Sequence, residues 1–223
     1  MVLLPGLDGT GILFRPLLAA LAGEANPQVI AYPQDRELGL DQLAEHVAGR
    51  LPPGEPLLVA ESFSGLVALT LLARGLARFR AVVFVAAFAE PPRPFLLRMT
   101  PLFKRAAPLV TSAPAFLLRQ YCLGPDATAA DLKLFREAVS GVSPAVLAQR
   151  MAIVATRHSF GRGTFDVPCL YLQASQDRLV PAASIRWFEQ RFATCRVERM
   201  PGPHFLLQAR PVECARKLER EAG

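Results

Sequence analysis

The sequence is poor in the residues that bind metals or cross-link small folds. It has four cysteines and three histidines in 223 residues. The cysteines stand far apart, with no C-x-x-C pair and no Cys/His ligand spacing, so neither a zinc site nor a disulfide framework is indicated. We expect free thiols and no bound metal.

Long hydrophobic runs are also absent. No apolar run reaches the roughly 18 residues that a membrane-spanning helix needs. The chain opens directly into Met1-Val2-Leu3-Leu4-Pro5-Gly6, without the charged region, apolar region and cleavage site of a secretory leader. We therefore expect no stable membrane insertion and a location in the cytoplasm.

Runs of like charge are missing as well, although the formal net charge is +6. The basic excess is scattered arginine without interleaved aromatic residues, so we expect no nucleic-acid binding. With 52% hydrophobic and 20% charged residues, the chain has the composition of a globular protein. Its length predicts a single domain over residues 1–223.

Short apolar runs alternate with segments of helical spacing along most of the chain. We expect strands at 2–4, 28–31, 56–60, 80–87, 167–173 and 196–200, and helices at 14–22, 41–51, 64–74, 182–192 and 211–221. Strands that are apolar throughout are typical of sheets covered by helices on both faces. The pattern predicts an α/β fold with a mainly parallel sheet.

The alternation is interrupted between residues 89 and 163. This segment is rich in Pro and Arg, has no convincing strand pattern, and shows helical spacing at 114–122, 129–140 and 144–156. We interpret it as a helical insertion within the one domain.

A serine stands where one apolar strand runs into a helix, in Leu57-Leu58-Val59-Ala60-Glu61-Ser62-Phe63-Ser64-Gly65. Small residues two positions to either side of Ser62 allow the sharp turn of a nucleophile elbow, with the outer glycines of G-x-S-x-G replaced. The alternative for Ser62 is a helix N-cap. Ser64 is a competing nucleophile, but it fits the turn less well.

Two later loops supply an acid and a base. Asp177 follows an apolar strand, and His204 lies in the breaker-rich loop Met200-Pro201-Gly202-Pro203-His204 after the last strand. Alone, Asp177 also fits a surface loop or helix cap. The other histidines are less suitable bases: His46 lies in a predicted amphipathic helix, and His158 lies in the insertion. The order Ser, Asp, His predicts a catalytic triad.

Together with Leu4-Pro5-Gly6-Leu7-Asp8-Gly9-Thr10-Gly11, these segments resemble the α/β-hydrolase superfamily of serine carboxylesterases, lipases and thioesterases. The resemblance implies a sheet of about six strands flanked by helices, with the insertion at 89–163 as a helical lid. It also implies an oxyanion hole formed by the backbone N–H groups of Leu7 and Phe63. Many relatives have His-Gly where this chain has Pro5-Gly6.

The glycine-rich segment leaves two questions open. Its alternative is a phosphate-binding loop, although it lacks the lysine and the glycine spacing of the known phosphate motifs. Asp8 has three interpretations: it braces the loop, contacts substrate, or occupies a turn.

The insertion has apolar residues that could line an acyl pocket, with Phe95, Leu118 and Tyr121 as candidates; the alternative is that they pack against the sheet and each other. Its basic residues Arg98, Lys104, Arg105, Arg119 and Arg150 would suit a carrier-bound substrate. A lid that faces water would be charged as well.

The first hypothesis is a serine hydrolase that cleaves a small acyl ester, free or carrier-bound, without metal or organic cofactor. An acyltransferase or thioesterase is the second, because the acyl-enzyme is shared and the segments also resemble plant plastid acyltransferase-like members. A non-catalytic binding protein of this fold is the third. Dehalogenase and epoxide hydrolase chemistry is disfavoured, because those relatives have aspartate at the elbow. The sequence does not indicate an oligomeric state.

Overall fold

A computed structural model describes residues 1–21, 26–92 and 113–223. Within these residues one sheet of six parallel strands has the order β2-β1-β3-β4-β5-β6. The strands are β1 (Val2–Leu4), β2 (Gln28–Val29), β3 (Leu57–Glu61), β4 (Ala81–Val85), β5 (Cys169–Ala174) and β6 (Cys195–Met200). The predicted fold class and strand number are confirmed.

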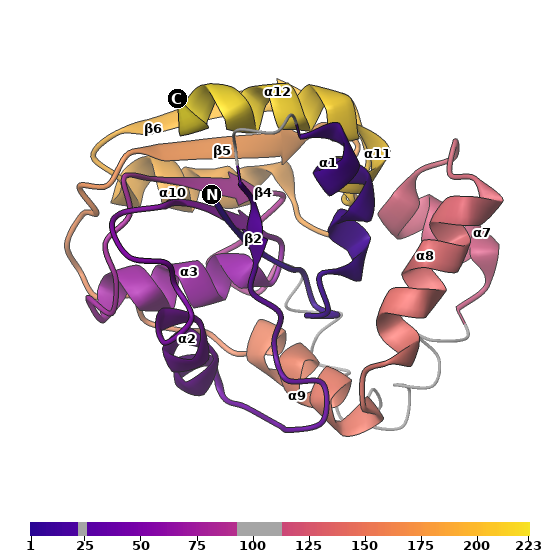
Figure 1. Cartoon of the computed structure of the whole chain (residues 1–223), viewed down its shortest axis with the longest axis horizontal. Helices are drawn as coiled ribbons and strands as arrows, with labels where there is room; N and C mark the ends of the chain where they lie inside the picture. The colour runs from indigo at the N-terminus through magenta and orange to yellow at the C-terminus, as the bar shows by residue number, and fades with distance from the viewer. Residues whose placement is uncertain (22–25, 93–112) are drawn as a thin grey trace.

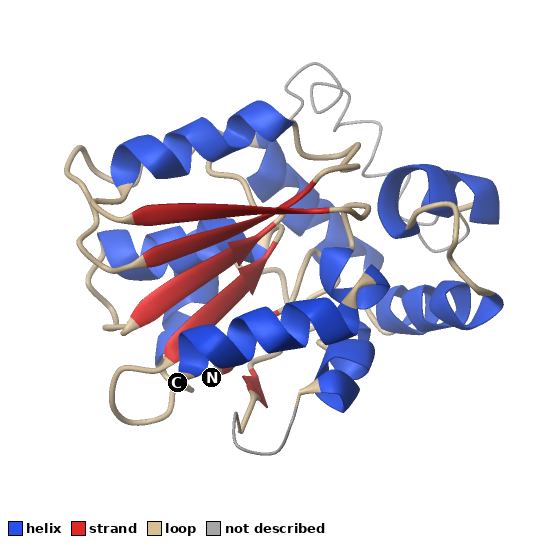
Figure 2. Cartoon of the chain, turned by 90° about the horizontal axis from the view of Figure 1, so that it is seen from above, coloured by secondary structure: helices blue, strands red, loops and turns tan. Residues whose placement is uncertain are grey.

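Helices cover both faces of the sheet, as Figures 1 and 2 show. One face packs on α2 (Leu40–Ala48), α3 (Ser64–Ala73) and α10 (Ile185–Arg191). The other packs on α1 (Arg15–Ala20), α11 (Leu206–Ala209) and α12 (Pro211–Ala222). Successive strand residues point to opposite faces, and both faces are buried. That double burial explains why β3, β4 and β5 are almost continuously apolar.

The segment between β4 and β5 contains helices and, in the described residues, no named strand. It comprises α7 (Ala115–Leu118), a π-helical turn η2 (Arg119–Leu123), α8 (Ala129–Ser140) and α9 (Pro144–Ala155). Figure 1 shows α7 and α8 beside the sheet rather than over one of its faces. A helical insertion was predicted here.

The insertion is attached to the sheet domain at several points. Arg15 at the start of α1 forms two hydrogen bonds with Glu137 of α8, at 2.8 and 2.6 Å. The backbone N–H of Ser143 donates to the carbonyl of Gln34 at 3.0 Å. Side chains of α9 join the core cluster on the α3 side of the sheet. Of the described helices of the insertion, α9 thus shares the hydrophobic core of the domain, while α7 and α8 pack in a cluster of their own.

The structure departs from the sequence prediction in local detail. The strand predicted at 28–31 covers Gln28–Val29 only. The helix predicted at 114–122 is divided into α7 and η2, and the one predicted at 182–192 begins as a 3₁₀ turn, η3 (Ala182–Ser184). A second 3₁₀ turn, η1 (Ile12–Phe14), precedes α1, and the single turn α11 was not predicted. Such short elements carry too few residues for a periodic signal.

Across the described ranges, no individual helix combines the length and apolar character needed to span a membrane. In the described part of the chain, one pair of helices, α8 and α9, meets that criterion when taken together, and the two are bent by 98° relative to each other.

Candidate active site

Ser62 occupies a strained turn between β3 and α3. Its φ of 50° lies in the left-handed region, which is costly for a residue with a Cβ. The turn is held by hydrogen bonds of 2.9 Å from the Ser62 N–H to the Val85 carbonyl and from the Gly65 N–H to the Ser62 carbonyl. The strand, the strained turn and the helix together form the elbow that the sequence predicts.

Gly65 allows α3 to approach the sheet edge. A Cβ at this position would lie 2.8 Å from the Cβ of Ala87 and 3.3 Å from the carbonyl oxygen of Phe88. The sequence therefore keeps glycine at the one elbow position where space requires it. Alanine and serine are tolerated at 60 and 64, where G-x-S-x-G has glycines.

A chain of hydrogen bonds joins Ser62, His204 and Asp177. The Oγ of Ser62 lies 2.9 Å from Nε2 of His204, and Nδ1 of His204 lies 2.8 Å from Oδ2 of Asp177. The other carboxylate oxygen accepts the backbone N–H groups of Leu179 and Val180, each at 2.8 Å. Because an ionised carboxylate only accepts, this arrangement puts the ring proton on Nδ1 and leaves Nε2 to accept from the serine.

Burial protects the hydrogen bond between His204 and Asp177 from water. The side chains of His204 and Asp177 are only 4% and 7% exposed, while Ser62 is half-buried. Water therefore competes weakly for the His204–Asp177 hydrogen bond, and the serine hydroxyl remains accessible from the adjoining cavity.

The competing serine, Ser64, has a different set of partners. It is fully buried, and its hydroxyl donates to the carbonyl oxygen of Pro5. Oγ of Ser64 is also hydrogen-bonded to the hydroxyl of Tyr32. These contacts tie α3 to the loop after β1, and they leave Ser64 without access to the cavity.

The two other histidines are engaged elsewhere. Nε2 of His46 lies 3.0 Å from the carbonyl oxygen of Ala31, where burial lowers the pKa of the imidazole. Nε2 of His158 lies 2.8 Å from the carbonyl oxygen of Ile153 at the end of α9. Of the three histidines, His204 is the one that the structure brings to Ser62.

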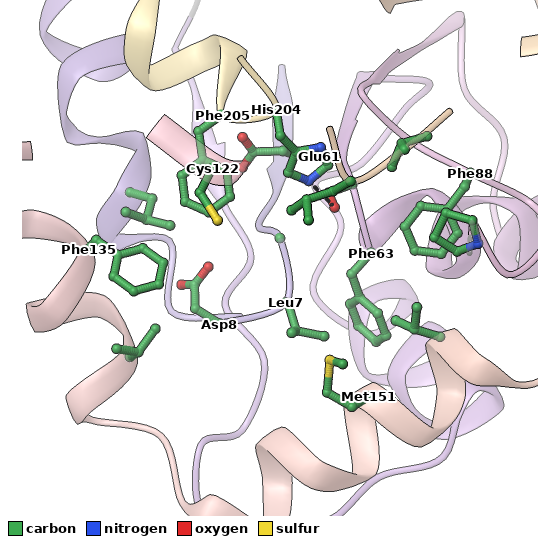
Figure 3. A pocket seen from close by; sticks show the side chains of 18 of the residues that line it. Leu7, Asp8, Glu61, Phe63, Phe88, Cys122, Phe135, Met151, His204 and Phe205 are labelled. Atoms are coloured by element: carbon green, nitrogen blue, oxygen red, sulfur yellow. Dashed lines mark hydrogen bonds between the residues drawn. The ribbon is translucent and has the colours of Figure 1, made fainter. Parts of the chain in front are cut away.

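The backbone N–H groups of Leu7 and Phe63 make no hydrogen bond among the described residues. These are the residues predicted to form an oxyanion hole, and both line the cavity at Ser62 (Figure 3). Buried backbone donors are normally paired, so two unpaired donors in the lining of one cavity are open to an acceptor there.

Asp8 closes the loop that carries Leu7. Its Oδ2 accepts the N–H of Thr10 at 2.9 Å and the hydroxyl of Thr10 at 2.5 Å. Burial raises the pKa of the Asp8 carboxyl, and the hydrogen bonds from Thr10 act against that shift. Of the three interpretations of Asp8, bracing of the loop is therefore the one supported by direct hydrogen bonds. Asp8 also lines the cavity.

An apolar cavity of about 310 Å³ opens at Ser62. Its walls come from the sheet domain and from α8 and α9, and Met151 of α9 lies near Leu7 and Phe63 in Figure 3. The apolar residues that line it are Leu7, Leu13, Phe63, Phe88, Pro92, Phe135, Val139, Leu147, Met151, Val154, Leu179, Val180 and Phe205.

The predicted pocket residues of the insertion do not form this lining. Leu118 is buried in a separate small cluster of the insertion, with Leu132 and Phe135. Tyr121 is 43% exposed and lies outside the lining. Leu118 therefore packs within the insertion, as the alternative expects, whereas Tyr121 neither lines the cavity nor is buried. Tyr121 lies in the π-helical turn, which departs from α-helical spacing. Phe95 lies outside the described residues.

Not all of the basic residues that would suit a carrier-bound substrate are free to contact one at the surface. Arg150 is 2% exposed, so it cannot meet a carrier at the surface. The guanidinium of Arg119 donates to the carbonyl of Ala127 at 3.2 Å. Arg98, Lys104 and Arg105 lie outside the described residues.

Glu61 is a buried carboxyl group that the sequence prediction left without a role. It ends β3 directly before Ser62, is 3% exposed and lines the cavity near His204 (Figure 3). No hydrogen-bond partner of its Oε1 occurs among the residues that the structure describes. Burial raises the pKa of Glu61 to about 7; Gln208, His204 and the backbone of Gly6 oppose the shift, and Asp8 adds to it. The sequence signal that could have pointed to Glu61 is a charged residue at the end of an otherwise apolar strand.

This carboxyl group makes stability depend on pH. Between the usual pKa of 4.5 and the folded value of about 7, the folded chain keeps a proton that the unfolded chain has released. The free energy of unfolding therefore falls as pH rises through this interval, by about 3 kcal/mol at most. We expect Glu61→Gln to lose less stability than wild type between pH 5 and pH 8, measured by denaturant unfolding.

The matched control is Glu55→Gln, which changes an exposed glutamate just before β3. It should keep the pH dependence of wild type. Identical curves for wild type and Glu61→Gln would mean that Glu61 stays ionised in the folded protein.

No group of three or more His, Cys, Asp or Glu side chains able to hold a metal ion occurs among the residues that the structure describes. The site thus combines the hydrogen-bonded chain of Ser62, His204 and Asp177 with the unpaired backbone N–H groups of Leu7 and Phe63 and an apolar cavity.

The model of the alpha/beta hydrolase family matches residues 1–217. The chain belongs to the alpha/beta hydrolase family. No curated protein sequence matches the chain. Several solved structures resemble the chain in fold at sequence identities of 20% or less.

One such structure is an esterase from Exiguobacterium antarcticum, with a TM-score of 0.83 and 14% identity over 99% of this chain and 90% of that one. Another is a type II thioesterase from the yersiniabactin biosynthetic pathway, with a TM-score of 0.68 and 18% identity over 99% and 91%. A haloalkane dehalogenase mutant from Agrobacterium tumefaciens C58 has a TM-score of 0.72 and 20% identity over 99% and 88%. At such identities the likeness concerns the fold, and the residues at the site must indicate the chemistry.

Proposed function

We propose that the protein is a serine hydrolase that cleaves carboxylic esters through an acyl-enzyme on Ser62. The observation that carries the proposal is the continuous hydrogen-bonded chain from Ser62 through His204 to Asp177 at the mouth of the apolar cavity. The serine at the elbow separates this site from relatives that use aspartate there.

In the first half-reaction the Oγ of Ser62 attacks the ester carbonyl carbon while its proton passes to Nε2 of His204. The resulting oxyanion accepts from the N–H groups of Leu7 and Phe63. When the intermediate collapses, the C–O bond to the alcohol breaks and the leaving oxygen takes the proton from His204. Asp177 stabilises the imidazolium that forms in between.

In the second half-reaction a water molecule takes the place of the alcohol. His204 accepts a proton from the water, whose oxygen attacks the acyl carbon. Collapse of this second intermediate releases the carboxylic acid and returns the proton to the Oγ of Ser62. An acyltransferase would use an alcohol or amine in place of water, and a thioesterase would begin from a thioester.

The cavity favours an uncharged, apolar acyl group. The ionisable side chains in its described lining are Asp8, Glu61, Cys122 and His204, with no lysine or arginine among them. A carboxylate on the acyl chain would enter an apolar space without a cationic partner, which is unfavourable. Neutral acyl chains are therefore the proposed substrates.

The test is hydrolysis of p-nitrophenyl esters across a series of acyl lengths. Each methylene that enters the cavity should raise kcat/KM about threefold to fourfold until the cavity is filled, since burial of a methylene stabilises by about 0.8 kcal/mol. Thioesters of the same acyl groups distinguish an esterase from a thioesterase. A folded protein without turnover of either series, and without covalent labelling by an organophosphonate, would contradict the proposal.

A substitution in the cavity wall makes the same test specific. Met151→Trp fills space beside Leu7 and Phe63, so we expect the preferred acyl length to become shorter and the rate with the shortest esters to change little. Ala145→Trp places the same side chain at an exposed position of α9 and serves as the control. An unchanged length profile in Met151→Trp would show that the acyl group binds elsewhere.

A further inference from the structure

Arg150 is a buried cation whose hydrogen bonds all go to backbone carbonyls. It lies on α9 and is 2% exposed. Its Nη1 donates to the carbonyl oxygens of Leu7 at 3.0 Å and Asp8 at 2.5 Å, and its Nη2 donates to that of Pro33 at 2.8 Å. The guanidinium also lies over the ring of Tyr32, with 5.6 Å to the ring centre. No ion pair of Arg150 occurs among the described residues.

Two of these acceptors belong to the loop that carries the proposed oxyanion donor. The N–H and the carbonyl of Leu7 lie on consecutive peptide planes, so a contact that fixes the carbonyl restricts the rotation that aims the N–H. Nη1 donates to two successive carbonyls of this loop, while Nη2 on the same rigid plane donates to that of Pro33. A lysine ammonium cannot reproduce all three contacts in the same geometry.

The loop is shaped to receive the guanidinium closely. Gly9 has a φ of 68°, and a Cβ built there would lie 2.4 Å from Nη1 of Arg150. The carbonyl of Gly9 is itself taken by the N–H of Tyr32 at 2.8 Å. The loop backbone is therefore held between the segment after β2 and the buried end of the Arg150 side chain.

Arg150 does not line the cavity, and its Nη1 and Nη2 both donate to backbone carbonyls of the protein. Arg150 therefore does not contact the reacting atoms. Its effect on the reaction would pass through the position of the Leu7 N–H.

We infer that Arg150 is a positioning residue for the oxyanion hole, through which α9 of the helical insertion sets the orientation of the Leu7 N–H. The inference rests on the proposed function, since it assigns a supporting residue to that same site. The rival interpretation is that Arg150 only attaches α9 to the sheet domain. Its loss would then destabilise the fold without a specific effect on the transition state.

The experiment compares Arg150→Lys and Arg150→Met with Arg191→Lys and Arg191→Met. Arg191 is a matched control, because its guanidinium also donates to two backbone carbonyls, those of Gly163 and Phe160, and lies over the ring of Trp187. These contacts lie outside the cavity lining. Thermal unfolding then reports the structural cost of each change, and p-nitrophenyl ester kinetics report kcat and KM separately.

We expect both Arg150 variants to lose kcat on the order of tenfold to a hundredfold with KM little changed, because the affected interaction forms in the transition state. A trifluoromethyl ketone that adds to Ser62 leaves an oxyanion in the hole, so its inhibition constant should rise by a similar factor. The Arg191 variants should keep the kcat and the inhibition constant of wild type, whatever stability they lose.

A folded Arg150→Lys protein with kcat and the inhibition constant within twofold of wild type would overturn the inference. Equal kinetic losses in the Arg150 and Arg191 variants would also overturn it, since they would indicate a general effect of destabilisation. If Arg150→Met does not fold, the lysine variant, which keeps the charge and the stem, decides between these outcomes. Failure of the proposed function is recognised separately, because wild type itself would then neither turn over an ester nor bind the ketone.

Discussion

Replacing Ser62 with alanine is expected to lower kcat about a million-fold, because the substitution removes the nucleophile and leaves the base without a reacting partner. The change deletes one oxygen from the half-buried elbow. Alanine carries the same Cβ as serine, so the strain of the positive φ is unchanged and the fold should be kept. Steady-state hydrolysis of a p-nitrophenyl ester, with circular dichroism as the check of folding, measures the effect.

Ser64→Ala is the matched control for this experiment. Ser64 lies two residues along the chain, is fully buried, and donates to the carbonyl of Pro5. An organophosphonate should label wild type and Ser64→Ala on Ser62 and leave Ser62→Ala unlabelled. Labelling that survives in Ser62→Ala and is lost in Ser64→Ala would exchange the roles of the two serines.

Asp177→Asn should lower kcat on the order of ten-thousand-fold, the size of effect expected when the tautomer of a catalytic histidine is reversed. One oxygen of Asp177 accepts the N–H groups of Leu179 and Val180. In asparagine the carbonyl oxygen must stay at that position, which turns the amide NH₂ toward Nδ1 of His204. The ring proton then moves to Nε2, where it faces Ser62 and the ring can no longer act as a base.

The measurement is kcat across a pH series, with Asp166→Asn as a control at an exposed aspartate just before β5. The control should retain wild-type rates. Turnover in Asp177→Asn close to that of wild type would place the orienting acid at another residue.

The parts of the site that the sequence predicts are those tied to regular elements. Ser62, Asp177 and His204 each lie in a segment that follows a strand, and the carboxyl ends of parallel strands meet at one edge of the sheet. Three loops that are far apart in the chain are therefore expected to converge once a parallel sheet is predicted. The same argument predicts the loop of Leu7, which follows β1.

Arg150 could not be predicted in the same way. An arginine within a helix at the surface of an insertion has the pattern of a solvated residue, and its three acceptors are backbone carbonyls, which carry no sequence signal. Only the placement of α9 against the loop reveals the contact. Tyr121 illustrates a related limit, because a π-helical turn changes which side chains face inward without changing the apolar composition.

The hydrogen bonds of Arg150 also limit how freely this protein can exchange parts with its relatives. Segments inserted between strands are the regions that families of enzymes replace most readily to obtain new specificities. Here a transplanted insertion without a guanidinium at this depth would leave the carbonyls of Leu7, Asp8 and Pro33 facing a gap. In such a chimaera the loop after β1 would lose the contacts that hold its backbone. Recombination experiments should therefore exchange α9 and this loop together.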